Sequence, residues 1–154
     1  MEFLLFLNSK EEEILKLIQM ANVRLEENTP LCSLSRKYFG FFKKNQNTVV
    51  ICTDNAKIHG GYFLNSLSNN DQFDRTSIYI RRALRHESVH VTQKCNNGNL
   101  LDLSSEKKLK FNPYKLNALK GSSKLSGNKE SEYQAYLLED KPNLIIKYLK
   151  IYCL

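Results

Sequence analysis

The first regular pattern of apolar positions lies between residues 9 and 27. Apolar side chains recur there with the spacing of one helical stripe, at Ile14, Leu17, Ile18, Ala21 and Leu25. Ser9, followed three residues later by Glu12, has the sequence of a capping box, and Pro30 would prevent the helix from continuing. The pattern therefore predicts an amphipathic helix over residues 9–27.

The apolar segments that follow are shorter and resemble strands. An aromatic run ends at Phe42, a polar turn comes next, and residues 48–53 (Thr-Val-Val-Ile-Cys-Thr) are mostly β-branched. We predict a hairpin over residues 36–53, with its second strand buried on both faces. A short strand is expected over residues 57–64, followed by a polar loop over residues 65–74.

A longer helix is predicted over residues 74–95. Asp74 is a suitable N-cap, and Asn96-Asn97-Gly98 provides a stop with a glycine for a left-handed cap. Five side chains of this segment are expected to face the core: Ile80, Ala83, Leu84, Ser88 and Val91.

The character of the chain changes over residues 104–129. Serine, lysine, asparagine and glycine dominate there, and this composition predicts a long flexible loop. Helices are expected again over residues 128–139 and from Pro142 to about Tyr152. Together these elements predict a single α+β domain over residues 1–154, with a small antiparallel or mixed sheet.

The strongest chemical signal is the HExxH motif His86-Glu87-Ser88-Val89-His90, within the predicted 74–95 helix. Positions i and i+4 lie on one helix face, so both imidazoles can reach a single ion, and zinc accepts such nitrogen ligands tetrahedrally. Glu87 is turned about 100° from His86, beside the metal rather than coordinated to it. There it can take a proton from a zinc-bound water and pass it to a leaving amine.

A zinc site of this kind needs a third protein ligand. The remaining histidine, His59, lies upstream beside a Gly-Gly pair, whereas the downstream candidates are acidic: Glu130, Glu132, Glu139 and Asp140. The pattern of residue types alone does not choose among these carboxylates.

The segment Glu132-Tyr133-Gln134-Ala135-Tyr136 resembles the glutamate-bearing helix of gluzincin-type metallopeptidases, which belong to the zincins. In that group the third ligand opens an acidic-x-x-Ala pattern on a helix that follows the HExxH helix. The resemblance implies a minimal zincin-like fold, a Zn²⁺ cofactor and a peptide or protein substrate. It also implies residue roles: His86, His90 and Glu132 as zinc ligands, and Glu87 as the catalytic glutamate. Glu130 remains the alternative third ligand.

Tyr136 follows Glu132 by one helical turn, which places a phenol on the same face, where it can donate to an oxyanion. We therefore predict a catalytic role for Tyr136, with core packing as the alternative. Some related enzymes carry an aspartate at this position that orients a histidine, so this chain lacks that carboxylate. His59 is expected on a loop or an edge strand, and is an alternative transition-state donor if the hairpin folds over the metal.

Composition and charge narrow the possibilities. The formal net charge is +7, and no nucleic-acid-binding motif accompanies it, so a basic nucleic-acid-binding domain is a disfavoured alternative. No apolar run is long enough to span a membrane, and the first residues lack the pattern of a secretory signal. These features predict a cytoplasmic protein with four free cysteines, a Cys52–Cys95 bridge being the disulfide alternative.

The sequence thus supports a zinc-dependent, metallopeptidase-like hydrolase. The main alternative is a catalytically weak or inactive module that binds or regulates on a zincin scaffold. A closed coordination sphere at the metal would favour that alternative, since catalytic zinc keeps a position open.

Overall fold

The computed structural model describes residues 1–64, 66–104, 106 and 110–154. It has the α+β class expected from the sequence, with a three-stranded sheet and six α-helices in these described ranges. The elements in chain order are α1 (Ser9–Met20), β1 (Arg24–Glu27), β2 (Gly40–Lys43), β3 (Thr48–Ile51), α2 (Thr53–Gly60), α3 (Asn69–Cys95), α4 (Pro113–Ser126), α5 (Lys129–Leu138) and α6 (Pro142–Cys153). Short 3₁₀ helices cover Glu2–Phe6, Pro30–Leu34 and Lys44–Gln46.

The sheet is mixed, with strand order β1-β3-β2. β2 and β3 form the predicted antiparallel hairpin, and β1 pairs in parallel with the other side of β3. All residues of β3 are buried, which confirms the expectation from its β-branched sequence. β2 is an edge strand of this sheet.

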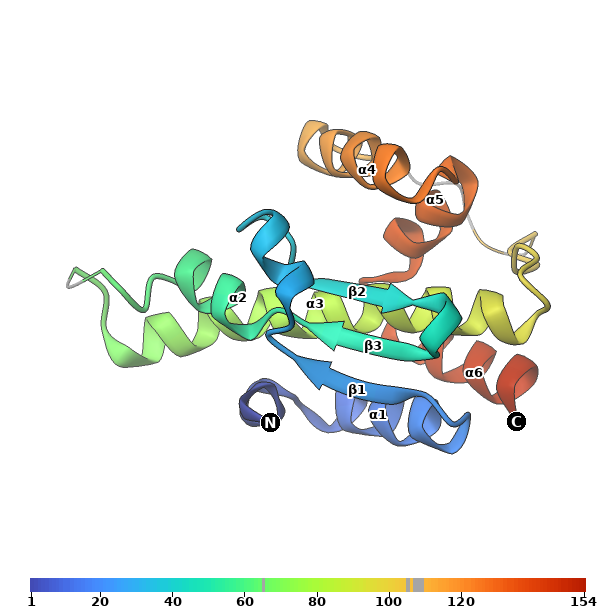
Figure 1. The fold of residues 1–154 in the computed structure, drawn as a ribbon, viewed down its shortest axis with the longest axis horizontal. Coiled ribbons are helices and arrows are strands. Elements are labelled where there is room, and N and C mark those ends of the chain that lie inside the picture. The colour runs from blue at the N-terminus through green and yellow to red at the C-terminus, as the bar shows by residue number, and fades with distance from the viewer. Residues whose placement is uncertain (65, 105, 107–109) are drawn as a thin grey trace.

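Helix α3 is the centre of the fold. It runs behind the sheet, with α1 and α6 packed on one side of it and α5 leading to α4 on the other (Figure 1). The five positions predicted to face the core, from Ile80 to Val91, are all buried. The predicted helices over residues 128–139 and from Pro142 onward are confirmed as α5 and α6.

The first predicted helix is too long, and its cap is wrong. Asn8, rather than Ser9, caps α1, and its side chain accepts hydrogen bonds from the amides of Lys10 and Glu11. The helix ends at Met20, after which Asn22 takes a positive φ of 60°. The remaining residues, 24–27, form β1, because pairing with β3 outweighs their helical periodicity.

Two predictions between the hairpin and α3 are also wrong. The expected strand over 57–64 is occupied largely by helix α2, which Gly61 ends in a left-handed conformation. The expected loop over 65–74 contains the start of α3 at Asn69, since the Ser68 side chain caps the helix by accepting from the amide of Asp71. Residue 65 lies outside the described residues.

The flexible loop predicted over residues 104–129 is wrong for most of its length, because α4 occupies residues 113–126. Asn112 accepts a hydrogen bond from the amide of Lys115, and Pro113 occupies the first turn. Gly127 then closes the helix with a φ of 73°. Asparagine followed by proline thus starts a helix here rather than ending one. Lys107 and Lys108, assigned to the same loop, lie outside the described residues.

The prediction of free cysteines is wrong, and so is the Cys52–Cys95 alternative. The fold instead joins Cys32 to Cys52, and Cys95 to Cys153. The second bridge fastens the C-terminal end of α3 to that of α6. In both pairs the Cα atoms lie within bridging distance, at 5.5 and 5.1 Å, a proximity that sequence spacing does not reveal. Among the described helices, none is long and apolar enough to span a membrane.

Candidate metal centre

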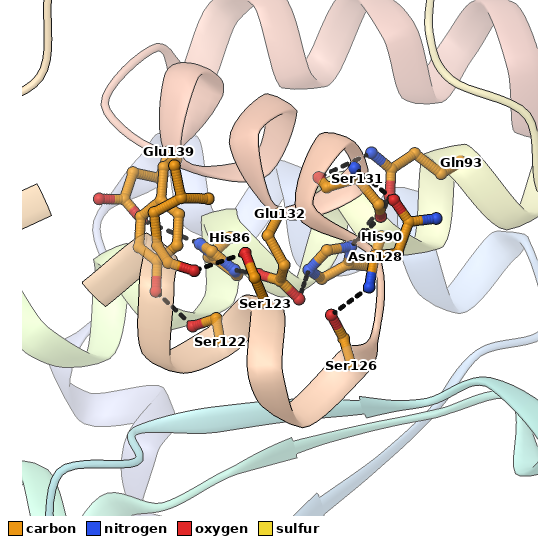
Figure 2. A network of polar contacts seen from close by, with 12 residues as sticks. His86, His90, Gln93, Ser122, Ser123, Ser126, Asn128, Ser131, Glu132 and Glu139 are labelled. Carbon is orange, nitrogen blue, oxygen red and sulfur yellow. Dashed lines mark hydrogen bonds and ion pairs between the residues drawn. The ribbon is translucent and has the colours of Figure 1, made fainter. Parts of the chain in front are cut away.

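The structure brings His86, His90 and Glu132 together between α3 and α5 (Figure 2). The potential ligand atoms of these three residues all lie within 4.8 Å of one another. Nε2 of His86 is 3.1 Å from one Glu132 carboxylate oxygen, and Nε2 of His90 is 3.3 Å from the other. The side chains therefore converge on one small volume from two helices.

Each histidine is held by a hydrogen bond on its other ring nitrogen. Nδ1 of His86 donates to a carboxylate oxygen of Glu139 at 3.0 Å, and Nδ1 of His90 donates to the amide oxygen of Gln93 at 2.9 Å. Such partners fix the ring orientation and tautomer of a metal-binding histidine. In both rings this arrangement directs Nε2 toward Glu132, as a metal ligand requires.

The local sequence explains how these partners reach the site. Histidines four residues apart on α3 share one face, and Gln93 follows His90 by three residues, within reach along the helix. Asn128 caps α5 by accepting from the amide of Ser131, which starts the helix so that Glu132 lies in its first turn. Glu139 lies two turns beyond Glu132, at the end of the same helix.

Buried polar contacts fix α5 against α3. The Gln93 amide donates to the backbone carbonyl of Ser131 and to the side-chain oxygen of Gln134. At the other end of α5, the Arg85 guanidinium donates to the Glu139 carbonyl and to the buried carboxylate of Glu11 on α1. Contacts at both ends of α5 thus set the position of the Glu132 and Glu139 carboxylates.

The electrostatics of the cluster reflect this proximity. Burial alone would lower the pKa of His86, but hydrogen bonds to Glu132 and Glu139 outweigh it and raise the pKa to about 10. Burial would raise the pKa of Glu132, but its hydrogen bonds with His86 and His90 hold the pKa far below its ordinary value. The site therefore combines the ionised carboxylate of Glu132 with a protonated His86, whose proton a bound cation can replace.

Glu87 lies beside this cluster. Its side chain is 7% exposed, and burial raises the pKa of its carboxyl group. Edge strand β2 approaches it closely, since a Cβ added at Gly40 would be 3.2 Å from Cγ of Glu87. Because Gly40 has no side chain, β2 can pack closely over Glu87.

Tyr136 also reaches the cluster. Its ring centroid is 4.5 Å from that of His86 in an edge-on arrangement, and its hydroxyl shares a 2.6 Å hydrogen bond with Ser122 of α4. Burial raises the pKa of Tyr136, so the phenol stays protonated at neutral pH. Tyr136 is therefore a possible hydrogen-bond donor at the site, as well as a packing partner of His86.

A cavity of about 700 Å³ opens onto these residues. His86, Glu87 and Tyr136 line it, together with Gly40 of the edge strand and residues of α4. His59 lines it as well, from the end of α2 rather than from a loop or an edge strand. His59 packs against Tyr79, and that residue precedes His86 by seven positions, or about 10 Å along the helix axis.

The residues present fit a zinc ion. Two imidazoles and one carboxylate form the donor set of one class of catalytic zinc site. Glu130 is exposed and lines a different groove, so the described geometry favours Glu132 over it as the third ligand. Glu139 is the carboxylate that accepts from Nδ1 of His86 and orients its ring. It can take the place of the orienting aspartate that some related enzymes carry at the position of Tyr136.

Comparison with known proteins gives one match. The model of a family described as a domain of unknown function, DUF8637, matches residues 3–154. No curated protein and no solved structure matches the chain significantly.

Proposed function

We propose that this chain, which belongs to the DUF8637 family, is a zinc-dependent metallopeptidase-like hydrolase. The proposal rests on one observation above all. The potential ligand atoms of His86, His90 and Glu132 lie within 4.8 Å of one another, and Glu87 lines a cavity together with His86. An HExxH motif that occurred by chance would not be expected to meet a buried carboxylate from another helix.

Zinc, when bound, supplies a Lewis acid that polarises a carbonyl and lowers the pKa of water to near neutrality. His86, His90 and Glu132 would hold it, and Glu139 and Gln93 keep the two imidazoles in the required tautomer. Because these five side chains are fixed by hydrogen bonds from α3 and α5, little reorganisation is needed for binding.

Glu87 is the proposed general base. Burial raises the pKa of its carboxyl group, which makes the carboxylate a stronger base than an exposed glutamate. In a hydrolysis reaction Glu87 would take the proton of the attacking water and deliver it to the leaving amine. Tyr136, protonated and next to His86, is the proposed donor to the oxyanion.

The edge strand supports a peptide as the substrate. Within the described residues β2 pairs with β3 on one side only, so its other backbone edge can pair with an extended chain. Gly40 at the start of β2 lines the cavity next to Glu87. An extended peptide laid along this edge would place its backbone beside the proposed base.

The mechanism is tested with Glu87→Gln. This variant keeps the shape of the side chain but cannot accept the proton, so zinc content should stay near that of the parent while turnover on a peptide library falls by at least about 100-fold. Glu130→Gln, an exposed carboxylate on α5, is the matched control and should cleave as the parent does. Equal turnover by Glu87→Gln would refute the mechanism. A zinc-loaded parent without turnover would favour the catalytically inactive module.

The cellular compartment of the protein can be tested through the state of its cysteines. The cytoplasmic location expected from the sequence stays a prediction, and the two disulfides weigh against it, because such bonds persist mainly in oxidising compartments. Alkylation of protein denatured directly from its native source, followed by mass spectrometry, would count the free thiols. Four free thiols would support a cytoplasmic location, and none would favour an oxidising one.

A further inference from the structure

The cavity has a second end whose chemistry differs from that of the metal centre. Phe39, His59 and Tyr79 line it there, and they come from the segment before β2, from α2 and from α3. The ring centroid of Phe39 is 5.1 Å from that of His59 and 4.9 Å from that of Tyr79. We call these three residues the aromatic wall.

The side chains of the aromatic wall are only partly buried. Phe39 and Tyr79 pack on core residues but keep part of their surface accessible, and His59 is exposed. Aromatic rings prefer to pair edge-to-face or offset-stacked, with ring centroids about 4.5–7 Å apart. The wall therefore presents a surface that another aromatic ring can complete.

His59 adds a polar feature to this surface. Its Nδ1 is 3.2 Å from the backbone oxygen of Asn55, and only a protonated nitrogen can bond to a carbonyl. In the neutral ring the proton therefore lies on Nδ1, and Nε2 is left as an acceptor. Among the described residues Nε2 of His59 has no hydrogen-bond partner, so it can accept from an indole N–H or a phenol O–H.

The distance to the metal centre fits a peptide. Tyr79 precedes His86 by seven residues on the same helix, or about 10 Å along its axis. An extended chain advances about 3.3 Å per residue, so this distance corresponds to about three residues. The wall lines one cavity with His86 and Glu87, so a single bound peptide can contact the wall and both of these residues.

We infer that the aromatic wall formed by Phe39, His59 and Tyr79 is a specificity subsite that binds an aromatic side chain, tryptophan or tyrosine above all, about three residues from the bond to be cleaved. This inference rests on the proposed function for its reference point, the cleaved bond. The binding preference itself needs no metal and no turnover.

The test measures binding rather than cleavage. The chain has no tryptophan, so the fluorescence anisotropy of a single indole in a peptide reports on the peptide alone. The probes are acetylated and amidated alanine hexapeptides that contain one tryptophan, and competing hexapeptides in which phenylalanine or leucine replaces it. The full-length Glu87→Gln protein is used, so that no probe is consumed.

The tryptophan peptide should bind about tenfold more tightly than the leucine peptide, because ring–ring contacts add to the burial of apolar area. His59→Ala, at an exposed position where folding is not at risk, should reduce the preference for tryptophan over phenylalanine by about threefold or more. Tyr79→Leu keeps apolar bulk and should remove most of the preference for aromatic rings over leucine. Phe63→Ala removes an aromatic ring that is 75% exposed and outside the cavity lining, and should change nothing.

Equal affinity for the tryptophan and leucine peptides would overturn the inference, as would a preference that both His59→Ala and Tyr79→Leu leave intact. Failure of the proposed function gives a different result. In that case the aromatic preference and its loss in the variants persist, while the parent protein neither holds zinc nor cleaves a peptide.

Discussion

Replacement of Glu139 by glutamine tests whether the histidine orientation seen in the structure matters for metal binding. Glu139 is 3% exposed, and a carboxylate oxygen accepts from Nδ1 of His86 at 3.0 Å. The amide of glutamine can keep a hydrogen bond to His86 but not the negative charge that makes the imidazole a better ligand. Loss of such a partner weakens metal binding by about 10–100-fold, or about 1.4–2.7 kcal/mol.

The measurement is the zinc dissociation constant of full-length protein, from competition with a chromophoric chelator at fixed pH. Asp140→Asn is the matched control, since this neighbour is 48% exposed and makes no contact with His86 among the described residues. Both positions pair with Arg82 and Lys115, so the control also corrects for the lost ion pairs. A change of less than about twofold in Glu139→Gln would refute the assignment of Glu139 as the orienting carboxylate.

Three further predictions follow from the geometry. Gly40→Val should lower peptide turnover by up to about 100-fold with zinc content unchanged, because its side chain would displace Glu87, and displacements of about 1 Å have such effects. Turnover equal to that of the parent would contradict this. The affinity for zinc should rise about tenfold per pH unit between pH 6 and 9, because the raised pKa of His86 means that its proton must leave when zinc binds. Calorimetry in buffers of different ionisation enthalpy counts the protons released, and release of no proton near pH 7 would contradict the prediction. Replacement of Cys95 and Cys153 by serine should lower the free energy of unfolding by about 4 kcal/mol, from the 58-residue separation of the bridge; urea denaturation measures this, and an unchanged midpoint would contradict it.

The parts of the fold that the sequence predicted are those governed by local pattern. The β-branched run over 48–53 became the buried strand of a hairpin, and the spacing of apolar side chains located the core face of α3. The HExxH motif fixes the relation of His86 to His90 within one helix, so its geometry follows from helical periodicity alone. Local rules were sufficient for these elements.

The predicted boundaries of helices and strands are wrong where the local sequence permits two conformations. Asn112 and Pro113 lie in the segment that composition predicts to be a loop, although this pair caps and opens α4. Residues 24–27 continued a helical pattern but were taken into the sheet as β1. In each case tertiary contacts or cap geometry decided between two conformations that the local sequence permits.

The partners that complete the site depend on how α5 packs against α3. Glu139 lies 53 residues from His86, so no spacing rule connects them, and Glu139 was one of several acidic candidates. Gln93 lies three residues after His90, within reach along α3, and this contact could have been proposed from sequence. The disulfide pairing cannot be predicted from the sequence for the same reason, since Cys95 and Cys153 meet only through the packing of α6 on α3.

Metal content is the measurement that tests the central claim most directly. The full-length protein, purified without added metal, is analysed by mass spectrometry beside His86→Ala, Glu132→Ala and the exposed control Glu130→Ala. The account predicts about one zinc per chain in the parent and in Glu130→Ala, and loss of zinc in the other two variants. A parent protein without zinc, or zinc that survives in His86→Ala and Glu132→Ala, would contradict it.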